Sequence, residues 1–409
     1  MKLLPGFRNS SSDRAGAPCE AFRARGSRNR IRQNAVVRDG RSAFWRTQLL
    51  WIVASVALGL ILACSLVTAG VSTNSVAAGL PADFLRGVNY AHVHRRGHGY
   101  GSETSAKELQ VLRKLGVNRI ALTPFGYQHS AKSDWIAEAT ADRSMTDEDI
   151  EREIAAAAKL GIRSMIKPHI WANDFWNGNE WHATVQQSSP EAHARWWASY
   201  REMILHYACV AQDADAESLC VGTELVEMTH RFPSEWRGLI ADVRKVFKGK
   251  LTYAGHWERE FEEITFWNDL DFIGITAYFP LAAPEGASIE QLTDAWRPHR
   301  ERIAKVQNQY HKPVVFLEIG YRPVTETHIQ PWLYDGGTPN AAAQARAFEA
   351  MFRALAGENW FKGIYIWKTF TDPEAPRRGM ERADFGFRGL PAEEVIARWF
   401  RGSTQPVHP

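Results

Sequence analysis

From about Phe84 onward, short apolar segments rich in β-branched residues alternate with longer amphipathic segments. This alternation predicts repeated strand–helix units and a parallel sheet, because amphipathic helices cover strands that are buried on both faces. Eight units can be counted, and the predicted strands are 85–90, 119–123, 163–168, 218–222, 251–255, 272–277, 314–318 and 363–367. The predicted helices are 103–115, 147–160, 190–212, 234–247, 259–267, 289–310, 340–356 and 391–400.

Local signals support individual helix boundaries. Thr146 precedes three acidic residues, which is typical of an N-cap followed by a first turn that favours negative charge. The sequence Lys159-Leu160-Gly161 ends the same helix with a basic residue and a glycine. No linker rich in Pro, Gly or Ser divides residues 83–402. We therefore predict an α/β fold, a single (β/α)8 TIM barrel over residues 83–402, preceded by one N-terminal signal or transmembrane helix.

The N-terminal part has a different composition. Residues 1–47 are basic and rich in Arg, Ser, Gly and Asn, which predicts a disordered segment. Residues 48–70 are mostly apolar and long enough to cross a bilayer, so we expect a signal peptide or a transmembrane anchor, followed by a linker over 71–82. The arginines before this run should stay in the cytoplasm. The folded domain is then exported, either anchored and facing the periplasm or cell exterior, or secreted after cleavage near 75–78.

Two alternatives stay open for this N-terminal part. Residues 61–64 resemble a bacterial lipoprotein signal, in which Cys64 would be acylated. The long polar lead is also compatible with a start site placed too far upstream. In either case the domain would contact a membrane through its N-terminal segment only.

Composition excludes several classes of protein. A net charge of +3 over 409 residues, with much of the basic excess before Arg46, argues against a nucleic-acid binder. Only Cys209 and Cys220 lie in the predicted domain, so we expect two buried thiols rather than a disulfide framework or a zinc pattern. We predict no cofactor. The sequence contains 16 tryptophans, whose flat apolar faces suit stacking against sugar rings, although most tryptophans in any protein fill the core.

In a barrel of this kind, the residues just after each strand gather at one mouth. The segment Pro313–Tyr321 is the clearest example: a buried apolar strand ends at Glu318, and Gly320 lets the chain turn away. The same carboxylate could simply end the strand with bonds to nearby backbone. The residues predicted to share this mouth are Asn89, Tyr90, His92, His94, His169, Trp171, Asn173, Asp174, Thr223, Glu224, His256, Trp257, Tyr278, Glu318, Tyr321 and Trp367.

Two glutamates on opposite sides of a barrel mouth suit the cleavage of a glycosidic bond, which needs a proton donor and a second carboxylate. Glu224 and Glu318 are the candidates. The acidic residues that compete with them follow helical or loop sequence and are expected to be solvated; they are Glu103, Asp174, Glu227, Glu258, Asp372 and Asp384. The histidines follow different predicted strands, so the sequence does not predict a metal site.

Several blocks in this order resemble glycoside hydrolase family 113 between about Gly87 and Trp367. They are Lys167-Pro168-His169, Val221-Gly222-Thr223-Glu224-Leu225, Trp236–Ile240, Leu251–Ala254, Phe266–Gly274, Ala277–Leu281 and Phe316–Tyr321. The resemblance implies a (β/α)8 barrel of a large retaining clan, with Glu224 as acid/base and Glu318 as nucleophile. It also implies that Tyr278 bonds the nucleophile, that Trp367 floors the sugar subsite, and that the substrate is β-mannan or mannooligosaccharides.

One position departs from the clan. Thr223 stands where most members carry an asparagine that contacts the sugar 2-hydroxyl, and the shorter threonine cannot make that contact in the same way. The preference for gluco or manno sugars therefore cannot be carried over from this position.

The resulting hypothesis is a retaining glycoside hydrolase that acts by double displacement on an oligo- or polysaccharide. The predicted substrate-binding residues are Asn89, His169, Trp171, Thr223, His256, Trp257, Tyr278 and Trp367. Two alternatives stay open. One is a carbohydrate-binding envelope protein without turnover, and the other is a glycosidase or transglycosylase acting on another exported β-glycan.

Overall fold

The computed structural model describes residue 19 and residues 79–138, 145–175, 180–374 and 384–402. The predicted basic segment, the predicted signal or transmembrane helix with Cys64, and most of the predicted linker lie outside these residues, apart from Cys19. Within the part of the chain that is described, no helix has both the length and the apolarity needed to cross a bilayer.

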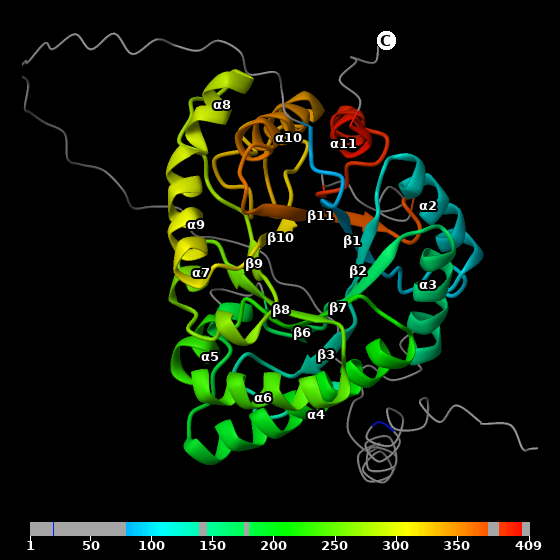
Figure 1. The fold of residues 1–409 in the computed structure, drawn as a ribbon, viewed down its shortest axis with the longest axis vertical. Helices are drawn as coiled ribbons and strands as arrows, with labels where there is room; N and C mark the ends of the chain where they lie inside the picture. The colour runs from blue at the N-terminus through cyan, green and yellow to red at the C-terminus, as the bar shows by residue number, and fades with distance from the viewer. Residues whose placement is uncertain (1–18, 20–78, 139–144, 176–179, 375–383, 403–409) are drawn as a thin grey trace, which may run out of the picture.

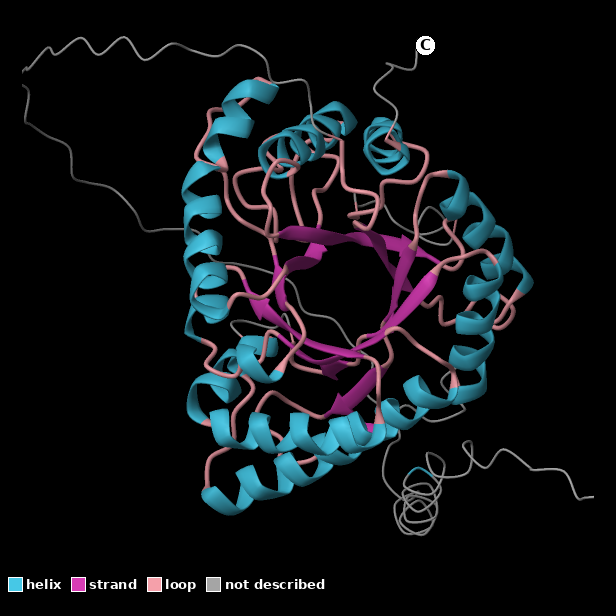
Figure 2. Ribbon diagram, in the orientation of Figure 1, coloured by secondary structure: helices cyan, strands magenta, loops and turns pink. Residues whose placement is uncertain are grey.

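Eight parallel strands close into a barrel whose neighbours follow the order of the chain (Figures 1 and 2). The strands are β1 (Leu85–Ala91), β2 (Arg119–Leu122), β5 (Arg163–Ile166), β7 (Ser218–Thr223), β8 (Lys250–His256), β9 (Ile273–Thr276), β10 (Val314–Ile319) and β11 (Phe361–Phe370). Strand β11 pairs with β1 and closes the ring. The TIM-barrel prediction is confirmed.

Helices form an outer ring around these strands (Figure 2). They are α2 (Glu103–Lys114), α3 (Asp147–Lys159), α4 (Pro190–Asp213), α5 (Val226–Arg231), α6 (Pro233–Val246), α7 (Glu260–Glu263), α8 (Ile289–Ala295), α9 (Arg297–Tyr310), α10 (Ala341–Leu355) and α11 (Pro391–Arg401), with 3-10 turns η2 (His182–Thr184) and η3 (Trp267–Asp269). The predicted cap at Thr146 is present, since its hydroxyl accepts from the Asp149 amide and the Asp149 carboxylate accepts from the Thr146 amide. This reciprocal arrangement is a capping box.

Two helix predictions were wrong in detail. The predicted helix 289–310 is divided into α8 and α9 at Trp296, because Pro298 lies in the first turn of a new helix and has no amide hydrogen to donate. The predicted helix 259–267 contains only the four residues of α7 and the start of η3. Ile264 and Phe266, which lie between these two turns, are buried in the core, so apolar contacts decide the path of this segment.

A second, three-stranded sheet was not predicted. Its order is β4 (Ala137–Glu138), β3 (Phe125–Gln128) and β6 (His169–Ala172), with β3 parallel to β6. Pro124 and Pro168 lie between barrel strands β2 and β5 and the strands that follow them. Since proline cannot donate to a strand ladder, it interrupts the pairing and lets the chain form a separate sheet. This sheet carries His169 and Trp171 at the mouth.

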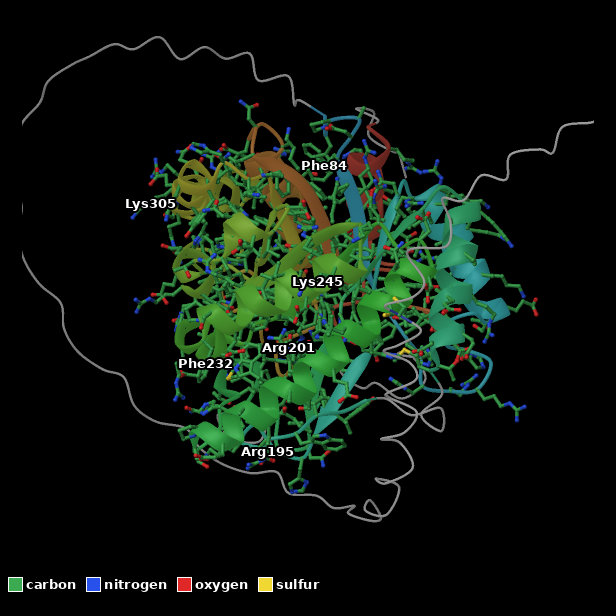
Figure 3. The ribbon with its side chains drawn as sticks, turned by 60° about the horizontal axis from the view of Figure 1, so that its bottom comes forward. Phe84, Arg195, Arg201, Phe232, Lys245 and Lys305 are labelled. Carbon is green, nitrogen blue, oxygen red and sulfur yellow. The ribbon has the colours of Figure 1, made fainter. Side chains whose placement is uncertain are left out.

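The core has two layers. The interior of the barrel is filled by Ala121, Met165, Cys220, Ala254, Phe272, Val315, Leu317 and Tyr365, and a larger cluster lies between the strands and the helices. Gly274 allows close contact, because a Cβ there would lie 2.3 Å from the Tyr253 carbonyl oxygen. Cys209 and Cys220 are buried, as expected. The outer faces of the helices carry charged side chains such as Arg195, Lys245 and Lys305 (Figure 3).

Candidate active site

Glu318 lies near the end of β10 and is 5% exposed. The Lys167 ammonium donates to its Oε1 at 2.5 Å, and the Tyr278 hydroxyl donates to its Oε2 at 3.1 Å. Gly320 then lets the chain pass close to β11, since a Cβ at this position would lie 2.3 Å from the Trp367 carbonyl oxygen. Both oxygens of a buried carboxylate are thereby held by donors on neighbouring segments, which fixes its orientation.

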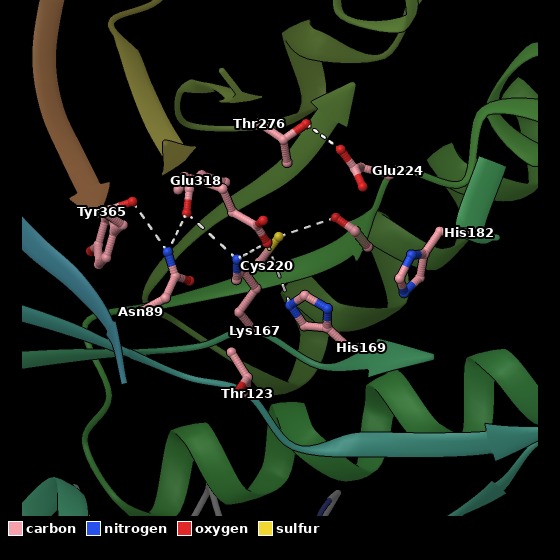
Figure 4. Close-up of polar contacts among 12 residues, drawn as sticks. Asn89, Thr123, Lys167, His169, His182, Cys220, Glu224, Thr276, Glu318 and Tyr365 are labelled. Atoms are coloured by element: carbon pink, nitrogen blue, oxygen red, sulfur yellow. Dashed lines mark hydrogen bonds and ion pairs between the residues drawn. The ribbon is translucent and has the colours of Figure 1, made fainter. Parts of the chain in front are cut away.

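Lys167 was not among the predicted site residues. Its side chain is fully buried directly after β5, and its ammonium lies 5.3 Å from the ring centroid of Trp367. Figure 4 shows Lys167, His169 and Glu318 pointing toward one another. A buried lysine needs a counter-charge, and the Glu318 carboxylate lies where it can supply one. A lysine at the end of an apolar strand is the sequence signal that could have identified it.

Glu224 directly follows β7 and is half-buried. Its backbone has φ of +53°, a left-handed conformation that is unfavourable for a residue with a side chain. The Thr276 hydroxyl donates to Oε1 of Glu224 at 2.6 Å (Figure 4). The backbone amide of Glu224 donates to the Ala254 carbonyl at 2.9 Å. These contacts hold the carboxyl group on the β8–β9 side of the mouth.

The two carboxyl groups differ in their electrostatic environment. Burial, and then the negative charge of Glu318, raises the pKa of Glu224 to about 8. Glu224 is therefore protonated at neutral pH, whereas Glu318 has a lysine as its direct partner. Such a pair can supply one proton donor and one anionic nucleophile at the same pH.

Two of the predicted histidines, His169 and His256, are buried and neutral. Burial, followed by the charge of Lys167, lowers the pKa of His169 well below its ordinary value, and Nε2 of this ring lies 3.8 Å from Oε1 of Glu318. Burial lowers the pKa of His256 to about 4. The His256 ring contacts Trp181, with centroids 5.0 Å apart. Neutral imidazoles can donate to or accept from sugar hydroxyl groups.

The predicted aromatic residues occupy different environments. Trp171 is 39% exposed on β6, whereas Trp367 is half-buried, with its ring centroid 6.1 Å from that of His169. Trp257 stacks on Trp332, with centroids 4.9 Å apart and planes at 22°. Trp332 was missed because it lies on the long connection after β10, which has no strand or helix pattern. The Trp367–Lys368 peptide bond is cis.

Asn89 and Thr223 are both buried near the two glutamates. The Asn89 side-chain nitrogen donates to the Leu317 carbonyl at 2.9 Å and to the Tyr365 carbonyl at 3.2 Å. Its amide hydrogens are thus directed at the barrel backbone, which the sequence prediction of a substrate contact did not anticipate. The Thr223 hydroxyl has no hydrogen-bond partner among the described residues.

The acidic residues expected to be solvated were only partly predicted correctly. Glu103 and Glu258 are exposed. Asp372 is 3% exposed and accepts from the Glu374 amide at 3.0 Å, and its Oδ2 lies 2.8 Å from Nδ1 of His98. The prediction for Asp372 was wrong, because the loop after β11 folds against the loop after β1.

Comparison with known proteins agrees with this geometry. The sequence profile of Glycoside Hydrolase Family 113 matches residues 88–390. The structure of a complex of a GH113 β-1,4-mannanase has 25% identity and a TM-score of 0.69, and the match covers 78% of this chain and 99% of that chain. The GH113 β-mannanase AaManA from Alicyclobacillus acidocaldarius, in complex with ManMIm, has 28% identity and a TM-score of 0.68, with 78% and 97% covered. No curated protein sequence matches the chain.

The family match extends from β1 to the segment just before α11 and includes both Glu224 and Glu318. The barrel, the paired glutamates at its mouth and this match agree with one another. The chain therefore belongs to glycoside hydrolase family 113 and is a glycosidase.

Proposed function

We propose that the chain is a retaining glycosidase that hydrolyses β-mannan or mannooligosaccharides. The observation that supports the mechanism best is the asymmetry of the two carboxyl groups. Lys167 and Tyr278 hold Glu318 as an oriented anion, while Glu224 is protonated at neutral pH. The two solved relatives described above are β-mannanases, which supports mannan as the substrate class.

In the first step, a lone pair of the Glu318 carboxylate attacks the anomeric carbon. The bond from that carbon to the leaving oxygen breaks, and this oxygen keeps the electron pair and takes the proton of Glu224. In the second step, Glu224 removes a proton from water, whose oxygen attacks the same carbon and releases Glu318. Two inversions at one carbon give net retention.

The other residues of the mouth are proposed to bind sugar. Trp367 would floor the subsite at the cleavage point, because its ring lies beside Lys167 and His169. Neutral His169 and His256, together with the Thr223 hydroxyl, would bond sugar hydroxyl groups. Trp171 and Trp257 would stack on sugars farther along the glycan.

The experiment that tests this function is hydrolysis of mannan, mannooligosaccharides and a panel of other β-glycans, with the anomer of the first product identified by ¹H NMR. We expect a β-mannoside to be cleaved with initial release of the β-anomer. Glu224→Gln and Glu318→Gln should each be inactive, whereas Glu258→Gln, which changes an exposed glutamate after β8, should retain activity. Release of the α-anomer would contradict retention, and exclusive cleavage of another glycan would contradict the substrate.

Azide rescue separates the two roles. With an activated aryl mannoside, azide should restore turnover of Glu224→Ala and give the β-glycosyl azide, because the covalent intermediate still forms on Glu318. Azide should replace the nucleophile in Glu318→Ala and give the α-glycosyl azide. The opposite pair of products would reverse the assignment.

We also propose that the enzyme acts outside the cytoplasmic membrane. The support is the apolar, uncharged run Leu49–Gly70 and the arginines that precede it. A fusion of residues 1–82 to a reporter that is active only after export should be active. Deletion of residues 48–70 should abolish this activity, and a reporter that remains active without them would contradict the proposal.

A further inference from the structure

Glu260 is a buried carboxylate that the mechanism above does not use. It lies in the short helix α7 and is 1% exposed. Three donors surround it: the Thr229 hydroxyl at 2.7 Å and the Tyr253 hydroxyl at 2.8 Å from Oε1, and the His256 amide at 2.7 Å from Oε2. No lysine or arginine among the described residues forms an ion pair with it. A buried carboxylate without a cation is costly, so three convergent donors indicate a specific role.

These donors connect Glu260 to the segment that carries Glu224. The Tyr253 hydroxyl, which donates to Glu260, accepts from the Leu225 amide at 2.7 Å. Leu225 directly follows Glu224, whose backbone is in the left-handed region. Thr229 lies one turn farther along, in α5. Glu260 thus holds the turn after β7 at two points, next to a residue whose conformation is unfavourable in isolation.

The third donor connects Glu260 to the next strand. His256 is the last residue of β8, and its amide donates to Oε2 of Glu260. This hydrogen bond fixes the end of β8 and the position of His256. Glu224 directly follows β7, and the strands β7 and β8 are adjacent in the barrel. One carboxylate therefore sets the position of both residues relative to each other.

We infer that Glu260 is a positioning residue for the reaction: through its three hydrogen bonds it holds the turn that carries Glu224 and the end of β8 that carries His256. This inference rests on the proposed role of Glu224 as acid/base. Glu260 is 1% exposed and both of its carboxylate oxygens accept hydrogen bonds from the protein, so its role is positioning and not contact with substrate.

An electrostatic effect accompanies this positioning once Glu260 is ionised, above about pH 7. After burial and the charge of Glu318, the charge of Glu260 also raises the pKa of Glu224, while the Thr276 hydroxyl and Lys167 lower it. Burial raises the pKa of Glu260 to about 7. The charge of Glu263 in the same helix also raises this pKa, whereas the three hydrogen bonds lower it. The remaining charged groups nearby have other partners: Glu263 pairs with His230 and Arg259, and Glu262 pairs with Arg302 of α9. His256 is neutral at neutral pH.

The decisive variant is Glu260→Gln, which keeps the shape of the side chain and removes its charge. The pKa of Glu224 should then fall. Because glycosidic cleavage needs protonated Glu224, the basic limb of kcat/KM should move to lower pH. The loss of one charge-assisted contact to the turn should also lower kcat roughly tenfold with little change in KM. Glu262→Gln, the same change two residues farther along α7, should leave both the limb and kcat unchanged.

A titration of Glu224 by carboxyl ¹³C NMR on the full chain needs no substrate, with the signal assigned through Glu224→Gln. A lower Glu224 pKa in Glu260→Gln than in the wild type would support the inference, even if no tested glycan is hydrolysed and the proposed function fails. An unchanged Glu224 pKa together with unchanged kcat in a folded Glu260→Gln protein would overturn it.

If Glu260→Gln does not fold, Tyr253→Phe tests the positioning part, since it removes the acceptor of the Leu225 amide and keeps the ring. Faster hydrogen exchange at the Leu225 amide and a lower kcat would support the inference. Unchanged exchange and kcat would overturn it.

Discussion

The ammonium group of Lys167 lies 2.5 Å from Oε1 of Glu318, and the two residues are 151 positions apart in the sequence. Lys167 is fully buried and Glu318 is nearly so. At a buried site the Lys167 ammonium attracts the carboxylate more strongly than it would in water, because solvent does not screen the two charges. The proposed nucleophile is thus a carboxylate whose counter-charge belongs to the protein rather than to solvent.

Replacing Lys167 by methionine should lower kcat by about a hundredfold, since removal of one charged group from a buried site costs on this order. The Glu318 carboxylate loses the donor that orients its Oε1, so kcat should fall with little change in KM. The measurement is kcat and KM beside Lys305→Met, which changes an exposed lysine of α9 and should match the wild type. An unchanged kcat in a folded Lys167→Met protein would contradict this role of Lys167.

Replacing Thr276 by valine should move the basic limb of kcat/KM to higher pH. The Thr276 hydroxyl donates to Glu224 and lowers its pKa, so loss of this bond should raise the pKa above about 8. The direction is opposite to that expected for Glu260→Gln. Profiles that move in the same direction in both variants would show that the limb does not report Glu224.

Glu224→Gln should make the protein more stable at pH 8 than the wild type. The pKa of Glu224 is raised from an ordinary value of 4.5 to about 8, so its contribution to stability is fully present below pH 4.5 and is lost as the pH rises toward 8. Glutamine is neutral throughout. Thermal unfolding should therefore show a higher Tm for the variant at pH 8 and no difference at pH 4. An equal Tm at both pH values would mean that burial of Glu224 does not disfavour its charge.

Asn89→Asp should destabilise the barrel by about 3 kcal/mol, because it places a carboxylate against two carbonyl oxygens and removes the amide donor from both. These oxygens belong to Leu317 and Tyr365 of β10 and β11. Urea unfolding at neutral pH measures the effect. Asn268→Asp, in the exposed part of η3, should change stability little.

A crystal structure should place the Glu224 and Glu318 carboxyl groups about 5 to 5.5 Å apart, the separation at which one carboxylate can reach the anomeric carbon directly. A separation near 9 Å would leave room for a water between them and would indicate inversion. This distance and the NMR assay of the product anomer are independent tests of the same mechanism.

The order of strands and helices could be predicted because periodicity is a local property. Each barrel strand appears in the sequence as a short apolar run, and each long helix as an amphipathic one. The positions of Glu224 and Glu318 followed from the same pattern, since both end strands of a predicted parallel barrel. The short strands β3, β4 and β6 carry no such pattern, and only their pairing at the mouth makes them strands.

The sequence by itself determined the eight-unit barrel and the two glutamates at its mouth, because strands, helices and strand ends each depend on the pattern of residues close together in the chain. Only the tertiary structure decided what surrounds those glutamates. Lys167 and Thr276 contact them from segments far away in the chain, and Glu260 acts on Glu224 through Tyr253 and Thr229. Nothing in the local sequence of these three residues indicates the partner. The environment of each carboxyl group depends on burial and on these distant groups. A physical reason for assigning one glutamate as acid and the other as nucleophile therefore exists only in the folded chain.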